Sequence, residues 1–550
     1  MTELLTAVAI IFIIAGPFLL IANRIETPAV PFLILAGIVA GFGIEEQLTF
    51  ELAQWGIALL VFFFGVQIQF DAVRMVLGDG EKIAIGQVLL VGGLGFGTGA
   101  LFGLSPDQAL YFGIAAAFSS TIVGTSLLET DIQKNLVRGR LAESINFVQD
   151  LLAILVILVL SAETLTGDAI AMQVGYGVFL LLAAMFVNRL LFDVIERLSQ
   201  GSSEQMIVSI IALLVVFLGT AQVLGVSIVV GAFAAGIAVR YDAETYFTVF
   251  DGLGSIRDFF VAIFFVTIGA LVSVPSVDVF IFAVVLGLLT AVVKPVITGI
   301  LLVYSGYETR SATLTSLSLD QVSEFALIIA IEALLLGLLL QSVFDAIILA
   351  AAATMITSSL SRAYDERIYR FLADRKLFEN QHGKIDERSS VPDSLSDHVI
   401  IVGYGRQGKQ LVETCERIDL SYVVIENDPI RFSALESDCE AYIFSDANEA
   451  YTWNKATVGD AQIIVSTVNS DPVSEYLLRF KNETDLVLRT DDISYATKLL
   501  ERGALYVCVD DTLAAEQLFG YIVSLEDGTL AGESLRTEQI ASLNESTERQ

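Results

Sequence analysis

Apolar residues fill about the first two thirds of the chain and then give way to a mixed, polar pattern. Runs of about 20 apolar residues, the length that a helix needs to cross a bilayer, recur up to residue 362 between short polar turns. We place thirteen membrane spans, at about 4–22, 28–43, 52–70, 83–103, 108–127, 141–160, 170–190, 205–224, 226–239, 256–273, 278–303, 311–337 and 343–361. The pattern therefore predicts a polytopic all-α membrane domain at 1–362, followed by a polar linker at 363–396.

A different pattern begins at residue 397. Short apolar strands alternate with helical stretches, and strand candidates lie at 398–403, 422–426, 441–445, 462–468, 485–490 and 505–509. Such alternation is typical of a doubly wound α/β sheet. We expect this domain to cover 397–525 and the remainder, 526–550, to form a polar tail with a composition typical of disorder.

Composition agrees with this division and excludes some classes of function. The 550 residues are 55% hydrophobic with a mean hydropathy of +0.70, as expected of an integral membrane protein. The net charge of −32 argues against nucleic acid as a partner. The three cysteines and two histidines have no metal-ligand spacing, so we expect no resident metal centre.

Basic residues in the loops predict the orientation. Neither Lys nor Arg occurs in the loops on one side, at 43–51, 104–107, 161–169, 272–278 and 338–342, or in the turn near Gly225. The loops on the other side carry the basic residues, among them Arg24, Arg74, Lys134, Arg138, Arg240, Arg310 and Arg362. The positive-inside rule then predicts a multi-pass protein of the cell membrane, with its N-terminus outside and its C-terminal domain in the cytoplasm.

Asp150 lies within an expected span, after Gln149 and before ten apolar residues. A charge at bilayer depth costs roughly 3 kcal/mol or more, so an ionisable residue there indicates a functional site. One carboxylate can hold a proton and a cation in turn, which is the minimum chemistry of proton-coupled cation exchange. The alternative is a structural ion pair with a basic residue of another helix.

Two further spans have sequences typical of interrupted helices. The fifth span has hydroxyl residues at mid-depth, including Ser120 and Thr121, and the twelfth has Asp320 and Glu324 among serines. Seven spans separate the two, so the helices run in opposite directions, as in inverted repeats whose broken helices cross at a substrate site. The alternative for each is a kinked helix whose hydroxyls bond to carbonyls.

The eleventh span contains Lys294, next to Pro295. A lysine at this depth needs an acid, and Asp150 is one candidate. The alternative is a lysine that extends to the membrane surface or binds the carbonyls of a broken helix.

The residues around Asp150 suit a large monovalent cation. Gln149 offers a neutral carbonyl, and Ser120 and Thr121 offer hydroxyls that replace the water around a weakly hydrated ion. With one titrating carboxylate, exchange of one K⁺ for one H⁺ is the simplest expectation. The Thr-Val-Gly-Tyr-Gly string of potassium filters does not occur, which argues against a potassium channel. The predicted ion-binding residues are Asp150, Gln149, Ser120, Thr121, Lys294 and Glu324.

A glycine fingerprint opens the soluble domain. It follows a strand and begins a helix, and an acid stands 18 residues after its last glycine. In such Rossmann-like domains glycines admit phosphates and the acid binds ribose, which favours AMP or NAD(H) over NADP. The predicted nucleotide-binding residues are Gly403, Gly405, Arg406, Gln407, Gly408, Glu426 and Asp446. We find no hydride-acceptor pocket, so we expect a nucleotide sensor rather than an oxidoreductase.

Residues 1–362 resemble the monovalent cation:proton antiporter family 2, and in particular its Kef-like potassium-efflux branch. The similar strings lie at 28–37, 62–65, 117–128, 149–150, 225–236, 264–269 and 321–326. The resemblance implies a homodimer in lipid, with a dimerisation bundle, a six-helix core and elevator-like alternating access. It also implies that Asp150 carries the ion or proton, and the Gln149–Asp150 pair favours potassium.

Residues 397–520 resemble the RCK/KTN (TrkA-N) regulatory domain, which implies nucleotide control of transport. The stretch 240–250 departs from the acidic motif of the glutathione-gated branch, so we expect no glutathione control. The sequence therefore predicts a nucleotide-regulated K⁺/H⁺ antiporter. The alternatives are a Na⁺/H⁺ antiporter and a ligand-gated cation channel.

Overall fold

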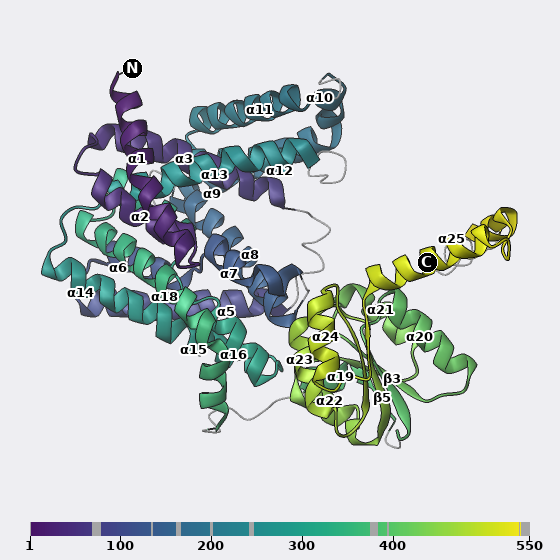
Figure 1. Cartoon of the computed structure of the whole chain (residues 1–550). Coiled ribbons are helices and arrows are strands. Elements are labelled where there is room, and N and C mark those ends of the chain that lie inside the picture. The colour runs from purple at the N-terminus through teal and green to yellow at the C-terminus, as the bar shows by residue number, and fades with distance from the viewer. Residues whose placement is uncertain are drawn as a thin grey trace. The chain divides into compact units, whose positions relative to one another are not determined.

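The computed structural model describes residues 2–68, 79–133, 136–160, 167–198, 202–240, 247–374, 383–392, 395–537 and 539–540. The chain forms two compact units, Met1–Gln381 and His382–Gln550, each of which is described by itself (Figure 1). Arg74 and Lys134, two of the basic residues used to predict the orientation, lie outside the described residues, as does most of the expected tail after residue 537.

The described residues of the first unit form helices joined by turns and short loops. Its helices are α1 (Thr2–Arg24), α2 (Ala29–Ala40), α3 (Glu46–Gln67), α5 (Asp79–Leu101), α6 (Pro106–Ala117), α7 (Thr121–Gln133), α8 (Val137–Leu160), α9 (Gly167–Phe186), α10 (Phe192–Leu198), α11 (Ser203–Leu224), α12 (Ile228–Ala238), α13 (Phe247–Ala270), α14 (Val277–Leu288), α15 (Lys294–Tyr304), α16 (Thr309–Leu317), α17 (Glu324–Leu335) and α18 (Gln341–Asp374). Single π-helical turns, Val187–Leu191 and Leu289–Val293, join α9 to α10 and α14 to α15.

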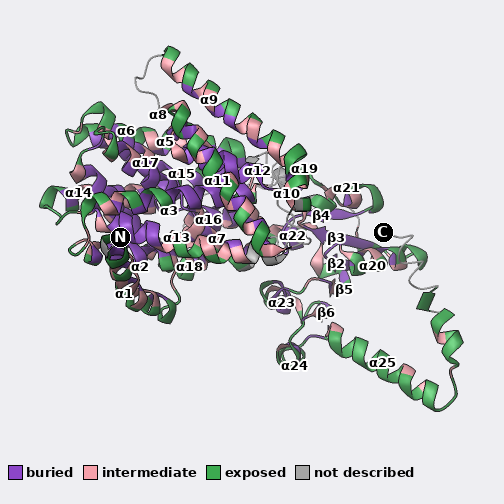
Figure 2. Ribbon diagram, turned by 90° about the horizontal axis from the view of Figure 1, so that it is seen from above, coloured by how far each residue is buried: buried purple, intermediate pink, exposed green. Residues whose placement is uncertain are grey.

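Ten helical stretches among the described residues are long and apolar enough to cross a membrane. The short apolar helices α2 and α12 and the interrupted pair α16–α17 supply the other positions, so each of the thirteen expected spans overlaps a helix or a broken helix. Large apolar side chains such as Leu5, Leu182 and Val223 are exposed on α1, α9 and α11. Such surfaces suit lipid rather than water. Figure 2 shows how little of α9 is buried.

The membrane unit contains two helix bundles. Helices α1, α2, α3, α11, α12 and α13 pack mainly against one another, and we call them the scaffold bundle. Helices α5 to α8 and α14 to α18 form the second group, which we call the crossover bundle. Helix α9 packs against α12 of the scaffold bundle and α8 of the crossover bundle.

Glycines hold the scaffold bundle together at two equivalent places. A Cβ atom on Gly37 of α2 would lie 2.1 Å from the carbonyl oxygen of Val266 on α13. A Cβ atom on Gly236 of α12 would lie 2.2 Å from the carbonyl oxygen of Phe62 on α3. The expected offset of seven spans relates the pair α2–α13 to the pair α12–α3. Small residues in the two short helices α2 and α12 therefore allow close backbone contact.

The second unit is an α/β domain with a seven-stranded sheet in the order β1-β4-β3-β2-β5-β6-β7. Strands β2 (His398–Val402), β3 (Tyr422–Glu426), β4 (Tyr442–Phe444), β5 (Ala461–Ser466), β6 (Asp485–Arg489) and β7 (Tyr506–Cys508) are parallel and correspond to the six expected strands. The short strand β1 (Ser389–Ser390), which the sequence analysis did not include, pairs antiparallel with β4. The order reverses between β2 and β5, where doubly wound sheets bind ligands.

The helices of this unit are α19 (Gly383–Glu387), α20 (Arg406–Arg417), α21 (Pro429–Asp438), α22 (Ala450–Lys455), α23 (Asp471–Leu477), α24 (Ile493–Glu501) and α25 (Asp510–Glu526). Alternate residues of β2 enter two separate apolar cores. Ile400 and Val402 lie in the core that contains Trp453, whereas Val399 and Ile401 lie in the core that contains Leu435. Helices therefore cover both faces of the sheet, as its buried strands require.

Candidate ion-binding and nucleotide sites

The two interrupted helices of the crossover bundle meet at their breaks. Residues 118–120 separate α6 from α7, and residues 318–323 separate α16 from α17. The Ser119 hydroxyl donates to the carbonyl of Leu319 at 2.9 Å, and Gln321 Nε2 donates to the carbonyl of Ser120 at 3.2 Å. The breaks expected from the hydroxyl-rich sequences are therefore present, and they contact each other although about 200 residues separate them.

Lys294 lies at both breaks and binds the carbonyl that follows the end of α6 and one within the break between α16 and α17. Its Nζ donates to the carbonyls of Phe118 at 3.1 Å and of Gln321 at 2.7 Å, and the side chain is fully buried. The carbonyl end of a helix carries partial negative charge, which a cation stabilises. The sequence left two interpretations of Lys294 open. In the structure the lysine binds backbone carbonyls, and it forms no ion pair with Asp150 in the part of the chain that is described. The acid that interacts electrostatically with Lys294 is Asp320.

Two buried carboxylates lie at the first turn of α7. The Thr121 hydroxyl donates to Asp150 Oδ2 at 2.6 Å, and the Ile122 amide donates to Glu324 Oε1 at 3.1 Å. Asp150 and Glu324 are 1% and 2% exposed. Asp150 Oδ1 and Glu324 Oε2 are buried without a hydrogen-bond partner. Since buried carboxylate oxygens are normally satisfied, these two atoms indicate capacity for a proton or a cation.

Gln149 and Ser120 hold the first break in shape. Gln149 Oε1 accepts from the Ser119 amide at 2.8 Å, and the Ser120 hydroxyl accepts from the Val123 amide at 3.2 Å and so caps α7. Their oxygens, expected as ion ligands, therefore already accept hydrogen bonds. Ser323 caps α17 in the same way through the Phe325 amide. The two breaks are thus built alike.

Several polar residues of the site were missed in the sequence. Asn146 lies one turn before Asp150 on α8, and its Oδ1 is buried without a partner. On α18, Thr354 accepts from the Val322 amide at 3.2 Å, and Ser358 donates to Gln321 Oε1 at 3.1 Å. The spacing of four residues in each pair, Asn146 with Asp150 and Thr354 with Ser358, is the signal that could have revealed them.

An aromatic cluster separates the site from the scaffold bundle. The ring of Phe64 on α3 lies 5.4 Å from Phe325, 5.9 Å from Phe233 and 6.4 Å from Phe147, measured between ring centroids. Phe325 follows Glu324 directly, and Phe147 precedes Asp150 by one turn. The two bundles therefore meet across apolar rings beside the buried carboxylates.

An ion-pair cluster lies at the N-terminal end of α8. Arg138 and Arg362 both bind Asp131, at 2.6 Å and 2.7 Å, and both bind Asp365. Arg310 binds Glu366 nearby on α18. Three of the basic residues expected on the cytoplasmic side, Arg138, Arg310 and Arg362, therefore lie close together on the crossover bundle.

The glycine fingerprint of the soluble unit lies between β2 and α20. Gly403 has a φ of 95°, which favours glycine, and a Cβ on Gly408 would lie 2.0 Å from the carbonyl oxygen of Gly403. A Cβ on Gly405 would lie 3.3 Å from Arg431 Nη1. Arg406 and Gln407 are exposed in the first turn of α20. Loop and helix N-terminus therefore have the shape that phosphate groups require.

Glu426 ends β3 and faces the fingerprint loop. Its Oε2 accepts from the Tyr404 amide at 2.6 Å, and its Oε1 accepts from the amides of Asn427 and Asp428 at 2.7 Å and 2.9 Å. Arg431 also binds Glu426 at 3.3 Å. The fingerprint loop thus fixes the position of this acid, and the loop and the acid together would bind the nucleotide. The sequence analysis did not identify Arg431. Its spacing of three residues from Asp428 is the only signal in the sequence that could have revealed it.

Two other groups complete the surroundings of this loop. Asp446 Oδ1 accepts from the amide and from Nδ2 of Asn448, each at 2.9 Å, so the side chain shapes the turn after β4. Tyr404 donates to Asp438 at 3.1 Å beside the buried Cys439. Burial raises the pKa of the Cys439 thiol to about 11 and raises the pKa of the Tyr404 hydroxyl as well.

Comparison with known sequences places this arrangement in a family. The profile of the sodium/hydrogen exchanger transmembrane domain matches residues 8–363, and that of the TrkA-N domain matches residues 399–510. The first match covers more than half of the chain, so the protein belongs to the sodium/hydrogen exchanger family. It is a cation/proton exchanger with a TrkA-N domain, a transporter and not an enzyme.

Individual relatives agree with the resemblance drawn from the motifs. The putative cation/proton antiporter YbaL of Escherichia coli (strain K12) is 28% identical over 541 residues, which cover 93% of this chain and 95% of YbaL. The putative K(+) efflux antiporter KefB of Alkalimonas amylolytica is 25% identical over 531 residues, which cover 91% of this chain and 78% of KefB. A Na(+)/H(+) antiporter of Enterococcus hirae is 28% identical over 330 residues, which cover 56% of this chain and 84% of that antiporter.

Proposed function

We propose that the protein exchanges a monovalent cation, K⁺ in preference to Na⁺, for H⁺, and that both occupy Asp150 in turn. One observation carries the proposal: Asp150 and Glu324 are buried at the first turn of α7, and each has an oxygen without a hydrogen-bond partner. Within the described residues neither acid pairs with a basic side chain. A buried carboxylate in this position must be neutralised by a proton or a cation.

The preference for K⁺ rests on the ligands around Asp150. The Thr121 hydroxyl and the unpartnered Oδ1 of Asn146 are neutral oxygens that supply the moderate field suited to a large ion. The similarity to KefB, named as a K(+) efflux antiporter, supports the same choice, whereas the relative from Enterococcus hirae is named for Na⁺. The choice between the two cations is therefore a question for transport measurements.

The two bundles support alternating access, which is the next part of the proposal. The glycine contacts at Gly37 and Gly236 bring backbones together within the scaffold bundle, which suits a fixed, dimer-forming part. The crossover bundle holds the broken helices and both acids, which suits the part that carries the ion. We propose that it moves past the aromatic cluster around Phe64, as in an elevator mechanism, and so exposes Asp150 to each side.

The test uses purified protein in liposomes. Wild-type protein should move protons when K⁺ is added and should move fewer when Na⁺ is added. The rate of exchange should also depend on pH, because the proton and the cation compete for Asp150. Asp150→Asn keeps the shape of the side chain and should abolish exchange without changing the melting temperature. Normal exchange by this variant would reject the proposal, and cation flux without proton movement would indicate a channel.

Regulation by nucleotide is the second part of the proposal. AMP or NAD(H) would bind with its phosphates at Gly403–Gly408 and its ribose at Glu426. The continuous helix α18 contacts the second break through Thr354 and Ser358 and is the last helix of the membrane unit before the soluble unit in the chain. In calorimetry the full chain should bind AMP or NADH more tightly than NADPH. Gly405→Asp should remove this binding, and unchanged affinity would contradict the nucleotide site.

Orientation and assembly complete the proposal. The basic residues Arg138, Arg310 and Arg362 lie together at one end of the crossover bundle, which supports a cytoplasmic location for that end and for the soluble unit at the cell membrane. Helix α25 exposes the large apolar residues Leu513, Leu518, Phe519, Ile522 and Val523. We propose that a second copy of the chain covers this face in a homodimer. Phe519→Glu should then weaken the dimer in light scattering, and Gln517→Lys, on the opposite side of the same helix, should not.

A further inference from the structure

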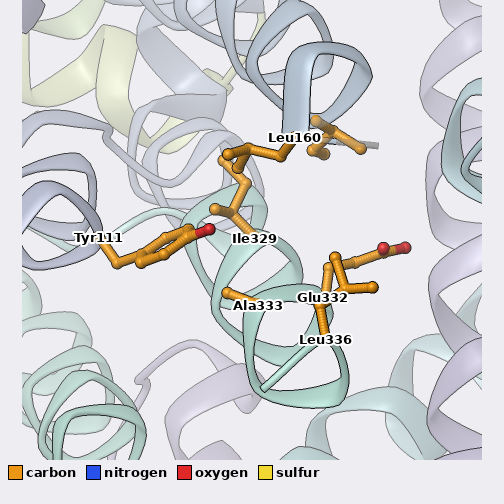
Figure 3. A pocket seen from close by; sticks show the side chains of 7 residues that line it. Tyr111, Leu160, Ile329, Glu332, Ala333 and Leu336 are labelled. Atoms are coloured by element: carbon orange, nitrogen blue, oxygen red, sulfur yellow. The ribbon is translucent and has the colours of Figure 1, made fainter. Parts of the chain in front are cut away.

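Polar contacts join the scaffold bundle to the crossover bundle at one end of the membrane unit. The Ser227 hydroxyl, at the start of α12, donates to Glu332 Oε1 on α17 at 2.9 Å. Figure 3 shows Glu332 with its carboxylate turned away from the small pocket that Tyr111, Ile329 and Ala333 help to line. The carboxylate therefore binds the scaffold bundle and does not point into the pocket of its own bundle.

A second contact lies at the start of α18. Gln341 Nε2 donates to the carbonyl of Leu271 at 2.9 Å and to Asp345 Oδ1 at 2.7 Å. Leu271 extends the last turn of α13, because its amide donates to the carbonyl of Thr267 at 3.2 Å. Asp345 also accepts from the Ser273 amide at 3.3 Å and is buried. The first turn of α18 is thus bound to the C-terminal end of α13 in the scaffold bundle.

Both contacts lie where the loops contain neither Lys nor Arg, beside the turn near Gly225 and the loops 272–278 and 338–342. The basic cluster is distant from them, since Arg362 comes 21 residues after Gln341 on α18, which corresponds to about 30 Å along the helix. The ion pairs of that cluster join α7, α8 and α18, which all belong to the crossover bundle. Those pairs can therefore travel with the bundle, whereas the two contacts with the scaffold bundle cannot.

The two contacts differ in kind from the aromatic cluster around Phe64. Apolar contact between rings is not directional, so one set of rings can be exchanged for another as the bundles slide. A hydrogen bond needs a fixed distance and angle between donor and acceptor. Ser227 with Glu332 and Gln341 with Leu271 are therefore satisfied in one relative position of the bundles and are lost when the crossover bundle moves.

We propose that these two hydrogen bonds form a latch that must open in every transport cycle. The proposal rests on the antiport function and the elevator movement proposed above, and it names contacts that control that movement. A sliding crossover bundle carries Glu332 and Gln341 away from Ser227 and Leu271 before Asp150 reaches the other side of the membrane. While the latch is closed it favours the present position modestly, and its loss shifts the population towards the other position.

The first experiment measures the distance between the bundles. In a variant whose three cysteines are replaced by serine, spin labels are attached at Leu5→Cys on α1 and Phe280→Cys on α14, both at exposed positions. Labelled chains are diluted with unlabelled chains in liposomes, so that only distances within one chain are measured. Pulsed electron paramagnetic resonance should then give a main distance and a second, less populated one.

Removal of the latch should change the ratio of the two distances. Ser227→Ala and Gln341→Ala each remove one hydrogen bond between the bundles and should raise the proportion of the second distance by about threefold. The double variant should show about the product of the two effects. Thr220→Ala is the matched control, because its hydroxyl bonds to the carbonyl of Val216 on the same helix, and it should leave the ratio unchanged.

The second experiment locks the latch. Ser227→Cys and Glu332→Cys, in the variant without native cysteines, replace two side chains that are in contact. Oxidation with copper phenanthroline should join the two thiols and stop K⁺-driven proton movement in liposomes, and a reductant should restore it. Each single cysteine variant, treated in the same way, should keep its rate.

Other outcomes overturn the inference. An unchanged distance ratio in the double variant of Ser227→Ala and Gln341→Ala would show that these bonds do not hold the bundle in position. Exchange that continues in the cross-linked protein would show that Ser227 and Glu332 need not separate, and failure to cross-link would contradict their contact. The antiport function is tested separately, because normal exchange by Asp150→Asn would reject it whatever the latch variants do.

Discussion

Thr121 donates a 2.6 Å hydrogen bond to Asp150, from the first residue of α7 to the middle of α8. The bond orients one carboxylate oxygen and leaves the other, Oδ1, buried without a partner. The break that ends α6 places Thr121 there, so the interruption of the fifth span and the carboxylate of the sixth form one site.

This relationship predicts the effect of removing one hydroxyl. Thr121→Val keeps the volume of the side chain and loses the hydrogen bond to a charged group, which is worth about 1.5–3 kcal/mol. We expect apparent K⁺ affinity in liposome exchange to fall by about tenfold or more. Thr121→Ser keeps the hydroxyl and should exchange almost normally. Equal activity of the two variants would mean that the hydroxyl does not act on Asp150.

Lys294 should be needed for folding stability as well as for transport. Lys294→Met leaves the carbonyls of Phe118 and Gln321 without their donor, at a cost of about 1–3 kcal/mol for each buried group. The melting temperature of the purified protein should therefore fall clearly. Lys498→Met, at an exposed position on α24, is the control and should leave it unchanged. A stable Lys294→Met protein would contradict the proposed compensation of the helix ends.

The glycine contacts predict that one methyl group disrupts the scaffold bundle. Gly37→Ala places a Cβ 2.1 Å from the backbone of α13, so the two helices must separate. Thermal unfolding in detergent should show a loss of about 1–3 kcal/mol, as is typical of overpacking. Gly97→Ala on α5 meets no atom within 4 Å and should be neutral or slightly stabilising. Similar melting temperatures for the two variants would contradict close packing at Gly37.

Cys439 should be unreactive while the soluble unit is folded. Burial raises its pKa from 9.0 to about 11, so very little thiolate exists near neutral pH. In a variant with Cys415→Ser and Cys508→Ser, Ellman's reagent should react slowly at about pH 8 and rapidly after unfolding. Because the folded pKa lies above the unfolded one, the contribution of this thiol to stability should be constant below about pH 9 and decrease as pH rises towards 11. Rapid reaction of the folded protein would contradict burial of the thiol.

Local patterns in the sequence predicted much of this structure. Hydroxyl residues and charges inside apolar spans marked both breaks, Asp150 and Glu324, because such groups are costly in lipid unless a site requires them. The period of the strands and the spacing of Gly403, Gly405 and Gly408 predicted six of the seven strands and the fingerprint loop. The strand β1 is only two residues long and leaves no detectable period.

The partners of these residues could not be predicted in the same way. The contact between Lys294 and Phe118 joins residues 176 positions apart, and no local pattern determines which of several acceptors a buried lysine reaches. Glu426 was expected to face ribose, but the sequence could not show that three backbone amides already bind it. Such contacts depend on how the elements pack, which composition and periodicity do not encode.

The repeated glycine contact has a consequence for the energetics of exchange. Helices α2 and α13 meet as α12 and α3 do, so the scaffold bundle contains two equivalent helix pairs, related by the offset of seven spans. If the crossover bundle moves past this scaffold as proposed, similar contacts support it at both ends of its travel, and neither resting position is strongly favoured. Gradients of the ions, rather than a preference of the protein fold, can then decide the direction of net transport.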